Sequence, residues 1–297
     1  MTMPIDTRMA TAAPIKGRSL WQDARARLFH NRAALVAMAL LFVIICLAVI
    51  VPIVSPYQLD GVDFDAIGLS PSLAQGHPFG TDTLGRDLFL RTMFGARISL
   101  LIGLVATLVS LIIGVAYGAV AGYVGGRIDA LMMRFVDILY SLPFIFFVII
   151  LMVVFGRNIM LIFVALGAVE WLTMARIVRG QTMALKGLDF IEAAVASGAS
   201  TPAIIRRHIV PNVLGSVIVY ATLTIPQVIL MESFLSFLGL GVQEPLTSWG
   251  VLISEGAQQM ETAPWLLIFP AGFLAVTLLC FNFLGDGLRD ALDPKDR

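Results

Sequence analysis

The chain has 297 residues, of which 58% are hydrophobic and only 13% are charged, and its formal net charge is zero. A soluble domain of this length carries roughly 25% charged residues, so much of this surface faces something other than water. The balanced charge argues against a nucleic-acid partner. The composition is that of an integral membrane protein.

Cysteine and histidine are too few and too scattered to build a metal site or a disulfide framework. Cys46 and Cys280 lie inside apolar runs, and His30, His77 and His208 lie far apart. Neither an HExxH motif nor paired cysteines occur. We therefore expect no bound metal, no cofactor and no catalytic residue.

Six apolar runs are long enough to cross a bilayer as helices, which requires about 20 residues each. They are too long for the strands of a membrane barrel, which alternate over about ten residues. The sequence thus predicts an all-α membrane fold with six transmembrane helices. Their expected bounds are Ala33–Val54, Ile98–Tyr123, Ile138–Phe155, Ile159–Ala175, Val213–Met231 and Trp265–Leu284.

The basic residues indicate the orientation, because they accumulate on the cytoplasmic side of a membrane. With six spans both termini share one side, and placing them inside leaves only Arg86, Arg91, Arg97 and Arg157 outside. We therefore expect both termini in the cytoplasm. The first span begins too late and runs too long for a cleavable signal.

A short amphipathic helix is expected just before the first span, in SLWQDARARLFHNR from Ser19 to Arg32. Ser19 and Gln22 have the spacing of a capping box. Because the span follows directly, we expect this helix to lie in the membrane surface rather than to form a soluble tail. Its expected apolar face consists of Trp21, Ala24, Leu28 and Phe29.

Glycines recur every fourth residue along the second span, at Gly114, Gly118, Gly122 and Gly126. This spacing places them on one helix face, where the missing side chains let another helix approach closely. We interpret the stripe as a helix-packing surface rather than a ligand site.

Prolines interrupt the third, fifth and sixth spans, at Pro143, Pro226 and Pro270. A proline removes one backbone hydrogen bond and kinks a helix. In a membrane this is tolerated where neighbouring helices or a water-lined cavity satisfy the freed carbonyl. The kinks fit a transport pathway and ordinary packing equally well.

A polar, helix-prone segment, DFIEAAVASGASTPAIIRRHIVP, separates the fourth and fifth spans. Asp189 is expected to cap a helix that ends at Gly198 in a left-handed turn. Thr201 is expected to cap a second helix with Pro202 at its first position. We favour a knob that docks into another protein over an ordinary surface loop. The expected contact residues are Glu192, Ala193, Ala194, Gly198, Arg206 and Arg207.

Two carboxylates lie in or at the end of a span, Glu170 in the fourth and Glu232 at the outer end of the fifth. Charges inside a membrane are candidates for a translocation path. The alternative for both is an internal ion pair or a position near the interface.

Several motifs resemble those of one known family. EAAVASG from Glu192, followed by HIVPN from His208, is similar to the EAA loop of ABC importer permeases, in the form found in peptide-type members. HPFGTDTLGRDLF, GARISLLIG, AGYVGGRID, ESFLSFLGLGVQEPLTSWG and GDGLRDALDPKDR resemble motifs of the peptide/nickel permeases, in the same order. The start, SLWQDARARLFHNRAAL, points more narrowly to the C-type permease subunit of bacterial oligopeptide importers.

The resemblance implies a type I ABC importer permease fold in the bacterial inner membrane, whose EAA helix docks into a cytoplasmic ATPase. The implied partners are a homologous B-type permease forming a heterodimer, two ABC ATPase subunits, a periplasmic or lipid-anchored peptide-binding protein, the peptide, and membrane lipid. The chain lacks the GxxxxGK[ST] phosphate loop, so ATP hydrolysis falls to its partners and it is not itself an enzyme.

The expected organisation follows from the spans and the resemblance together. It comprises a cytoplasmic tail (1–32), a first transmembrane helix (33–55), a periplasmic loop (56–97), a five-helix core (98–285) with a cytoplasmic coupling loop (180–212), and a cytoplasmic tail (286–297). In the periplasmic loop we expect Arg86 and Asp87 to fix turns or pair. That loop and the segment Gly241–Glu261 are candidate contacts for the binding protein.

Three alternatives remain at this point. Permeases for dipeptides, glutathione or nickel share the fold and many of the motifs. A stand-alone secondary transporter needs coupling carboxylates in mid-span, which are nearly absent here. A membrane-anchored enzyme needs a catalytic constellation, and the sequence offers none.

Overall fold

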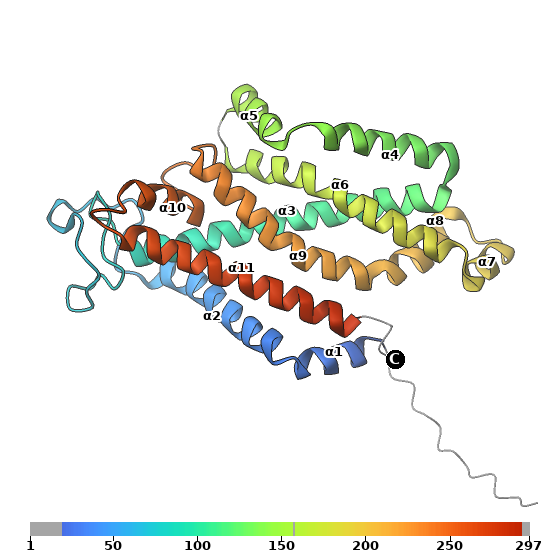
Figure 1. Cartoon of the computed structure of the whole chain (residues 1–297), viewed down its shortest axis with the longest axis horizontal. Helices are drawn as coiled ribbons and strands as arrows, with labels where there is room; N and C mark the ends of the chain where they lie inside the picture. Colours follow the sequence, from blue (N-terminus) through green and yellow to red (C-terminus); the bar gives the residue numbers. More distant parts are fainter. Residues whose placement is uncertain (1–19, 157, 293–297) are drawn as a thin grey trace, which may run out of the picture.

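The computed structural model describes residues 20–156 and 158–292, and the regular elements in these two ranges are helices, apart from two isolated β-bridges in one loop. The predicted all-α fold is confirmed. The elements (Figure 1) are α1 (Leu20–His30), α2 (Arg32–Val54), the 3₁₀ turn η1 (Phe64–Ala66), α3 (Leu88–Val124), α4 (Gly126–Ser141), α5 (Phe144–Phe155), α6 (Ile159–Lys186), α7 (Asp189–Ala196), α8 (Thr201–Ile204), the π-helical turn η2 (Ile205–Ile209), α9 (Val210–Phe237), α10 (Trp249–Gln258) and α11 (Trp265–Leu292).

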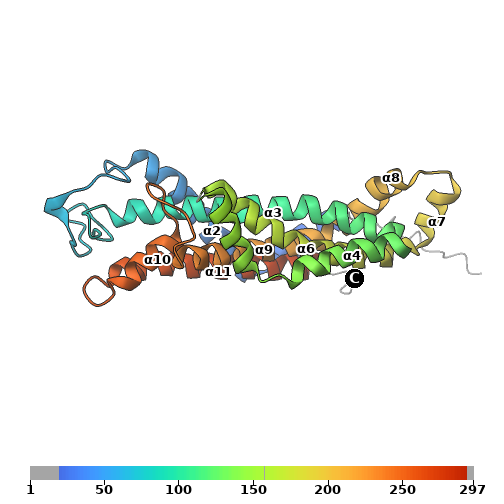
Figure 2. The ribbon, with the colours of Figure 1, turned by 90° about the horizontal axis from the view of Figure 1, so that it is seen from above.

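The long helices form a bundle whose two ends carry different short elements (Figures 1 and 2). Helix α7 lies at one end, called here the α7 end, and α10 lies toward the other, called the α10 end. Within the described residues five helices are long and apolar enough to cross a membrane, or six if α4 and α5 count as one span. Because α3 arrives at the α7 end and α6 leaves from the opposite end, α4 and α5 must return the chain, which makes six crossings (Figure 1).

The third predicted span differs most from the structure. Instead of one helix over Ile138–Phe155, α4 and α5 meet at an angle of 84°. Pro143 stands at the break, and Leu142 before it is extended, with ψ 129°. A proline disfavours the helical conformation of the preceding residue, which explains the bend. Pro226 and Pro270, in contrast, lie inside the unbroken helices α9 and α11.

Helix α3 begins ten residues earlier than the predicted second span, at Leu88 rather than Ile98. Asp87 caps it, because its carboxylate accepts a hydrogen bond from the backbone N–H of Leu90 at 2.7 Å. The loop expected to reach Arg97 therefore ends before Leu88. Arg91, Thr92 and Arg97 interrupt the first turns of α3, lower the local hydropathy and hide the true start of the helix.

Helix α3 is the central element and contacts α2, α6, α9, α10 and α11. Three of the four glycines in the stripe face α6. A Cβ atom placed on Gly118 would lie 2.4 Å from the carbonyl oxygen of Ala175, and one on Gly114 would lie 2.6 Å from the Met174 side chain. Gly122 faces α6 in the same way. Gly126 does not belong to this contact, because α3 ends at Val124 and turns there.

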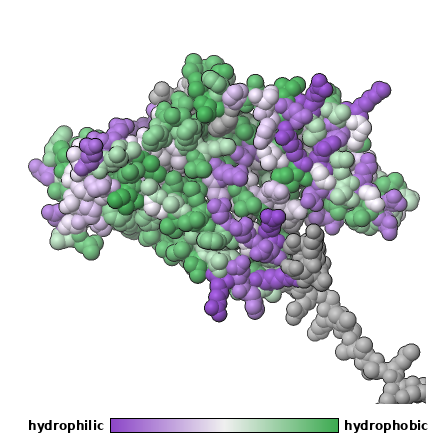
Figure 3. Space-filling view, in the orientation of Figure 1, coloured by the Kyte–Doolittle hydropathy of each residue, from purple (hydrophilic) through white to green (hydrophobic). Residues whose placement is uncertain are grey.

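Helix α1 packs beside α11 and α2 rather than standing apart from the bundle. Ala24 is buried, while Phe29 is 52% exposed. Ser19 and the side chains of Trp21 and Gln22 lie outside the residues that the structure describes. The surface over the middle of the bundle is mostly hydrophobic, and hydrophilic residues gather toward the α7 end (Figure 3).

Candidate functional site

Helix α7 projects from the end of the bundle, and its first turn differs from the prediction (Figures 1 and 2). Leu188, not Asp189, is the N-cap residue, with φ −88° and ψ 145°. Asp189 lies inside the first turn, where its charge interacts favourably with the helix dipole. In the same way Ser200, not Thr201, precedes α8 as its N-cap.

The turn at Gly198 closes α7 as the sequence predicted. Gly198 has φ +80°, the left-handed conformation that side chains disfavour. Its N–H donates to the Val195 carbonyl at 2.9 Å, and the Ala199 N–H donates to the Ala194 carbonyl at 3.1 Å. These two bonds form a Schellman motif, which reverses the chain directly after the helix.

One face of α7 holds it to the bundle and the other is open. Ile191 is buried and packs in one cluster with Ile204, Ile209 and Val213. The outward side exposes polar and small residues together with apolar ones. Its exposed residues are Glu192, Ala193, Val195, Phe190, Gly198, and, beyond the turn, Arg206 and Arg207; Ala194 is half-buried.

The second helix of this segment is not a separate unit. Helix α8 passes through the π-helical turn Ile205–Ile209 directly into α9, so the segment Thr201–Phe237 forms one helical rod of 37 residues. Arg206 and Arg207 lie on the π-helical turn and, within the described chain, have no ion-pair partner. No loop therefore separates α8 from α9.

Glu232, one of the two carboxylates that the sequence offers as candidates for a path, lies in the interior of this subunit. Its side chain is fully buried, at 0% exposure, between α3, α9 and α10. It accepts hydrogen bonds from the hydroxyls of Ser236 at 2.6 Å and Ser99 at 3.2 Å. The hydroxyl of Ser99 in turn accepts a hydrogen bond from the backbone N–H of Trp249 at 3.2 Å. The carboxylate thus joins three helices.

Glu170 has a different environment. It is 8% exposed and lines a cavity of about 520 Å³ bounded by α4, α5, α6 and α9. The structure therefore separates two carboxylates that sequence patterns treated alike. One is enclosed by serines, and the other borders a cavity between α4, α5, α6 and α9.

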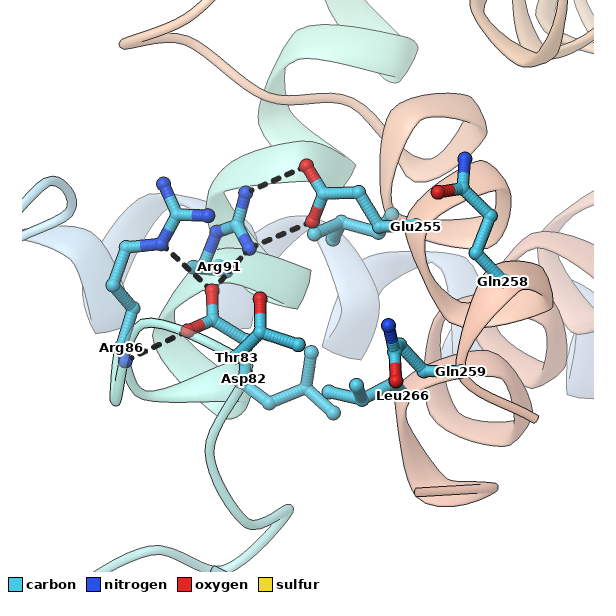
Figure 4. A pocket seen from close by; sticks show the side chains of 10 residues that line it. Asp82, Thr83, Arg86, Arg91, Glu255, Gln258, Gln259 and Leu266 are labelled. Atoms are coloured by element: carbon cyan, nitrogen blue, oxygen red, sulfur yellow. Dashed lines mark hydrogen bonds and ion pairs between the residues drawn. The ribbon is translucent and has the colours of Figure 1, made fainter. Parts of the chain in front are cut away.

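The expected pairing of Arg86 is confirmed, but it belongs to a larger network of charges at the α10 end that the sequence did not reveal (Figure 4). Asp82 pairs with both Arg86, at 2.7 Å, and Arg91, at 2.5 Å. Arg91, only 2% exposed, also makes a two-pronged contact with Glu255 on α10, at 2.9 and 3.2 Å. Burial lowers the pKa of the Arg86 guanidinium, but its hydrogen bonds to Glu244 and Asp82 raise it above its ordinary value. The network fastens the loop to α3 and α10.

A second set of ion pairs joins α4 to α6 near the α7 end. Arg179 makes a two-pronged contact with Asp129, at 2.5 and 2.6 Å. Arg176 bonds to Asp137 at 2.8 Å and also covers the Tyr140 ring at 4.3 Å. From the sequence both arginines indicate only the orientation, because their partners lie 39 and 50 residues away in the chain.

The fold and its long apolar helices define a multi-pass membrane protein with an exposed α7 knob at one end. Residues 114–297 match the family model "Binding-protein-dependent transport system inner membrane component", and residues 19–71 match "N-terminal TM domain of oligopeptide transport permease C". The chain belongs to this family of inner-membrane ABC importer permeases, whose members are transport subunits rather than enzymes.

Comparison with individual proteins shows which members of this family the chain is most similar to among those compared. The chain is 61% identical to the oligopeptide transport system permease protein OppC of Escherichia coli K12, over 95% of this chain and 94% of that protein. It is 48% identical to the dipeptide transport system permease protein DppC of Bacillus subtilis, over 94% of this chain and 87% of that protein. Among solved structures, a chain of the inward-facing MetNI methionine ABC transporter matches with TM-score 0.54 at 20% identity, over 69% of this chain and 96% of that chain, which supports the fold.

Proposed function

We propose that this chain is one of two permease subunits of an ATP-driven importer for oligopeptides. The observation that carries the substrate class is the high identity to oligopeptide permeases along almost the whole chain. The partners are a homologous B-type permease, two ABC ATPases that hydrolyse ATP, and an external peptide-binding protein. We place both termini and the α7 end in the cytoplasm, in line with the basic residues there.

The α7–α8 segment is proposed as the coupling element. Its open face offers Glu192, Ala193 and the turn at Gly198 to a groove of the ATPase, with Arg206 and Arg207 at the edge. The continuous rod into α9 supports this role, because movement imposed on the knob reaches the membrane without loss in a loop. A ligand or ATP drives such a change only by favouring one state over the other.

The substrate is tested by uptake in cells with and without the gene. We expect loss of labelled oligopeptide uptake, while uptake of a labelled dipeptide and of nickel is unchanged. Loss of dipeptide uptake instead would favour the second candidate, a dipeptide permease, which the 48% identity to a dipeptide relative supports. Unchanged uptake of all three in a strain lacking other peptide importers would contradict the proposal.

The coupling role is tested at the turn. Replacing Gly198 by alanine imposes a left-handed conformation that costs a residue with a side chain roughly 1–2 kcal/mol, and proline cannot adopt it at all. We expect Gly198→Ala to reduce transport and Gly198→Pro to abolish it, with membrane insertion intact. Gly187→Ala is the matched control, because Gly187 has φ −88° and open space around it. Normal uptake with Gly198→Pro would refute the role.

A further inference from the structure

The cavity beside Glu170 has the dimensions and walls of a ligand site. Its volume of about 520 Å³ falls within the range of roughly 300–1,000 Å³ typical of small-molecule pockets. Its walls are largely aromatic and aliphatic, and Glu170 is the one charged side chain among the residues that line it. The polar and aromatic lining includes Phe135, Tyr140, Phe147, Trp171, Thr173 and Gln227.

Glu170 has no partner for its carboxylate within the described part of the chain. Its side chain is more than nine-tenths buried, yet it makes neither a hydrogen bond nor an ion pair there. An unpaired charged carboxylate is costly to bury, and charged groups within a membrane commonly pair with other groups or face a water-filled cavity. The structure therefore leaves a place for one positive charge.

The nearest arginines along α6 are already engaged. Arg176 is held by Asp137 and lies over the Tyr140 ring, and Arg179 is held by Asp129 through two short bonds. Neither is free to neutralise Glu170 without breaking an existing pair. Neither arginine is therefore left for Glu170, and a cation from outside the chain can fill this place.

The chemistry of the walls favours an organic ammonium over a metal ion. Aromatic rings attract alkylammonium groups through their faces, and Tyr140 and Trp171 border the cavity. A divalent transition metal such as nickel requires several nitrogen, oxygen or sulfur ligands. Among the described residues no group of three or more His, Cys, Asp or Glu side chains is placed to hold a metal.

We propose that this cavity is a transit subsite that receives the N-terminal ammonium of the peptide, with Glu170 as its counter-charge. The proposal rests on the proposed peptide importer and names the group of the substrate that this residue contacts. A single carboxylate facing a half-open cavity attracts the N-terminal ammonium, which peptides share. It does not by itself select among their side chains. Such a contact suits a carrier of many sequences.

The test uses the complete importer, with its ATPases and binding protein, reconstituted in proteoliposomes. The maximal rate of ATP-driven uptake is measured for one tripeptide with a free N-terminus and for its N-acetyl form, at saturating binding protein. We expect the wild type to move the free form faster, and Glu170→Gln to slow it about tenfold while leaving the acetylated form nearly unchanged. Glu170→Asp, which keeps the charge, should retain much of the preference.

The controls separate this role from a structural one. Asp290→Asn removes an exposed carboxylate from α11 and should leave both rates unchanged. The subsite is overturned if Glu170→Gln leaves the ratio of the two uptake rates unchanged, for example by slowing both peptides equally. It is also overturned if the variant loses the partner permease from the purified complex. If the wild-type complex moves neither peptide, the proposed importer function fails instead.

Discussion

At the scale of single residues, the hydroxyl of Ser99 connects three helices. It donates to Glu232 on α9 and accepts from the Trp249 N–H at the start of α10, both at 3.2 Å. Glu232 receives a second hydrogen bond from Ser236. The contact places a carboxylate near the N-terminus of α10, where a helix dipole favours negative charge.

Removal of this hydroxyl should destabilise the protein. Ser99→Ala leaves a buried N–H and part of a buried carboxylate unpaired, which costs about 1–3 kcal/mol for each unsatisfied group. We expect a lower midpoint of thermal unfolding for the purified permease pair. Ser110→Ala is the control on the same helix, because the Ser110 hydroxyl is buried without a hydrogen-bond partner in the described chain. Equal effects of the two changes would contradict this account.

The two membrane carboxylates show what the sequence can and cannot predict about a residue. Hydropathy alone identifies Glu170 and Glu232 as exceptional, because each interrupts or ends an apolar run. Their environments depend on residues far away in the chain: Ser99 is 133 positions from Glu232. No local sequence pattern encodes the contact between Ser99 and Glu232. The different environments of the two carboxylates therefore follow only from the packing of the helices.

At the scale of elements, the contact between α3 and α6 depends on missing side chains. A Cβ on Gly118 would lie 2.4 Å from a backbone oxygen of α6, a distance that requires the helices to separate. Overpacking of this kind costs about 1–3 kcal/mol. We expect Gly118→Ala to lower thermal stability and the yield of assembled complex.

The matched control for this helix contact is Gly180→Ala, at a position of α6 with open space around it. Alanine favours a helix over glycine, so no loss of stability is expected there. The comparison is made by thermal unfolding in the same detergent. If Gly180→Ala is as damaging as Gly118→Ala, the close approach of α3 and α6 is not the cause.

The attachment of α10 to α3 depends on Arg91. This buried side chain contacts Asp82 and Glu255 together, and removal of one partner from a buried ion pair typically costs about 3–5 kcal/mol. We expect Arg91→Ala to destabilise the α10 end strongly, and Arg91→Lys to do so partly because lysine lacks the two-pronged guanidinium. Hydrogen exchange of α10 measures the effect. The exposed Arg97 on α3, changed to alanine, should leave exchange unaltered.

Hydropathy predicted the apolar middles of the helices well and their ends poorly. The reason is that the ends are set by caps and ion pairs rather than by lipid. Asp87 starts α3 outside the apolar run, and Pro143 divides a continuous apolar run into α4 and α5. The Schellman turn at Gly198 was predictable, because a glycine directly after a helix-forming stretch is the local signal for this motif.

At the scale of the whole molecule, α7 and the long connection between α2 and α3, to which Leu73 belongs, lie at opposite ends (Figure 1). In a variant whose Cys46 and Cys280 are replaced by alanine, a single new cysteine reports the side. We expect Leu73→Cys, at a position 86% exposed, to react with an impermeant maleimide in spheroplasts. Ser197→Cys should react only after the membrane is opened. The reverse pattern would contradict the proposed orientation.

The unbroken rod from Thr201 to Phe237 has a mechanical consequence. At a rise of 1.5 Å per residue it is about 55 Å long, and Gly285 of α11 packs closely against its Leu223, roughly three-fifths along. A rod that tilts about this point behaves as a seesaw with arms of roughly 33 and 21 Å. A push at the α8 end then displaces the Phe237 end in the opposite direction by about two-thirds as much. Closing one side of the bundle and opening the other become a single motion of one helix.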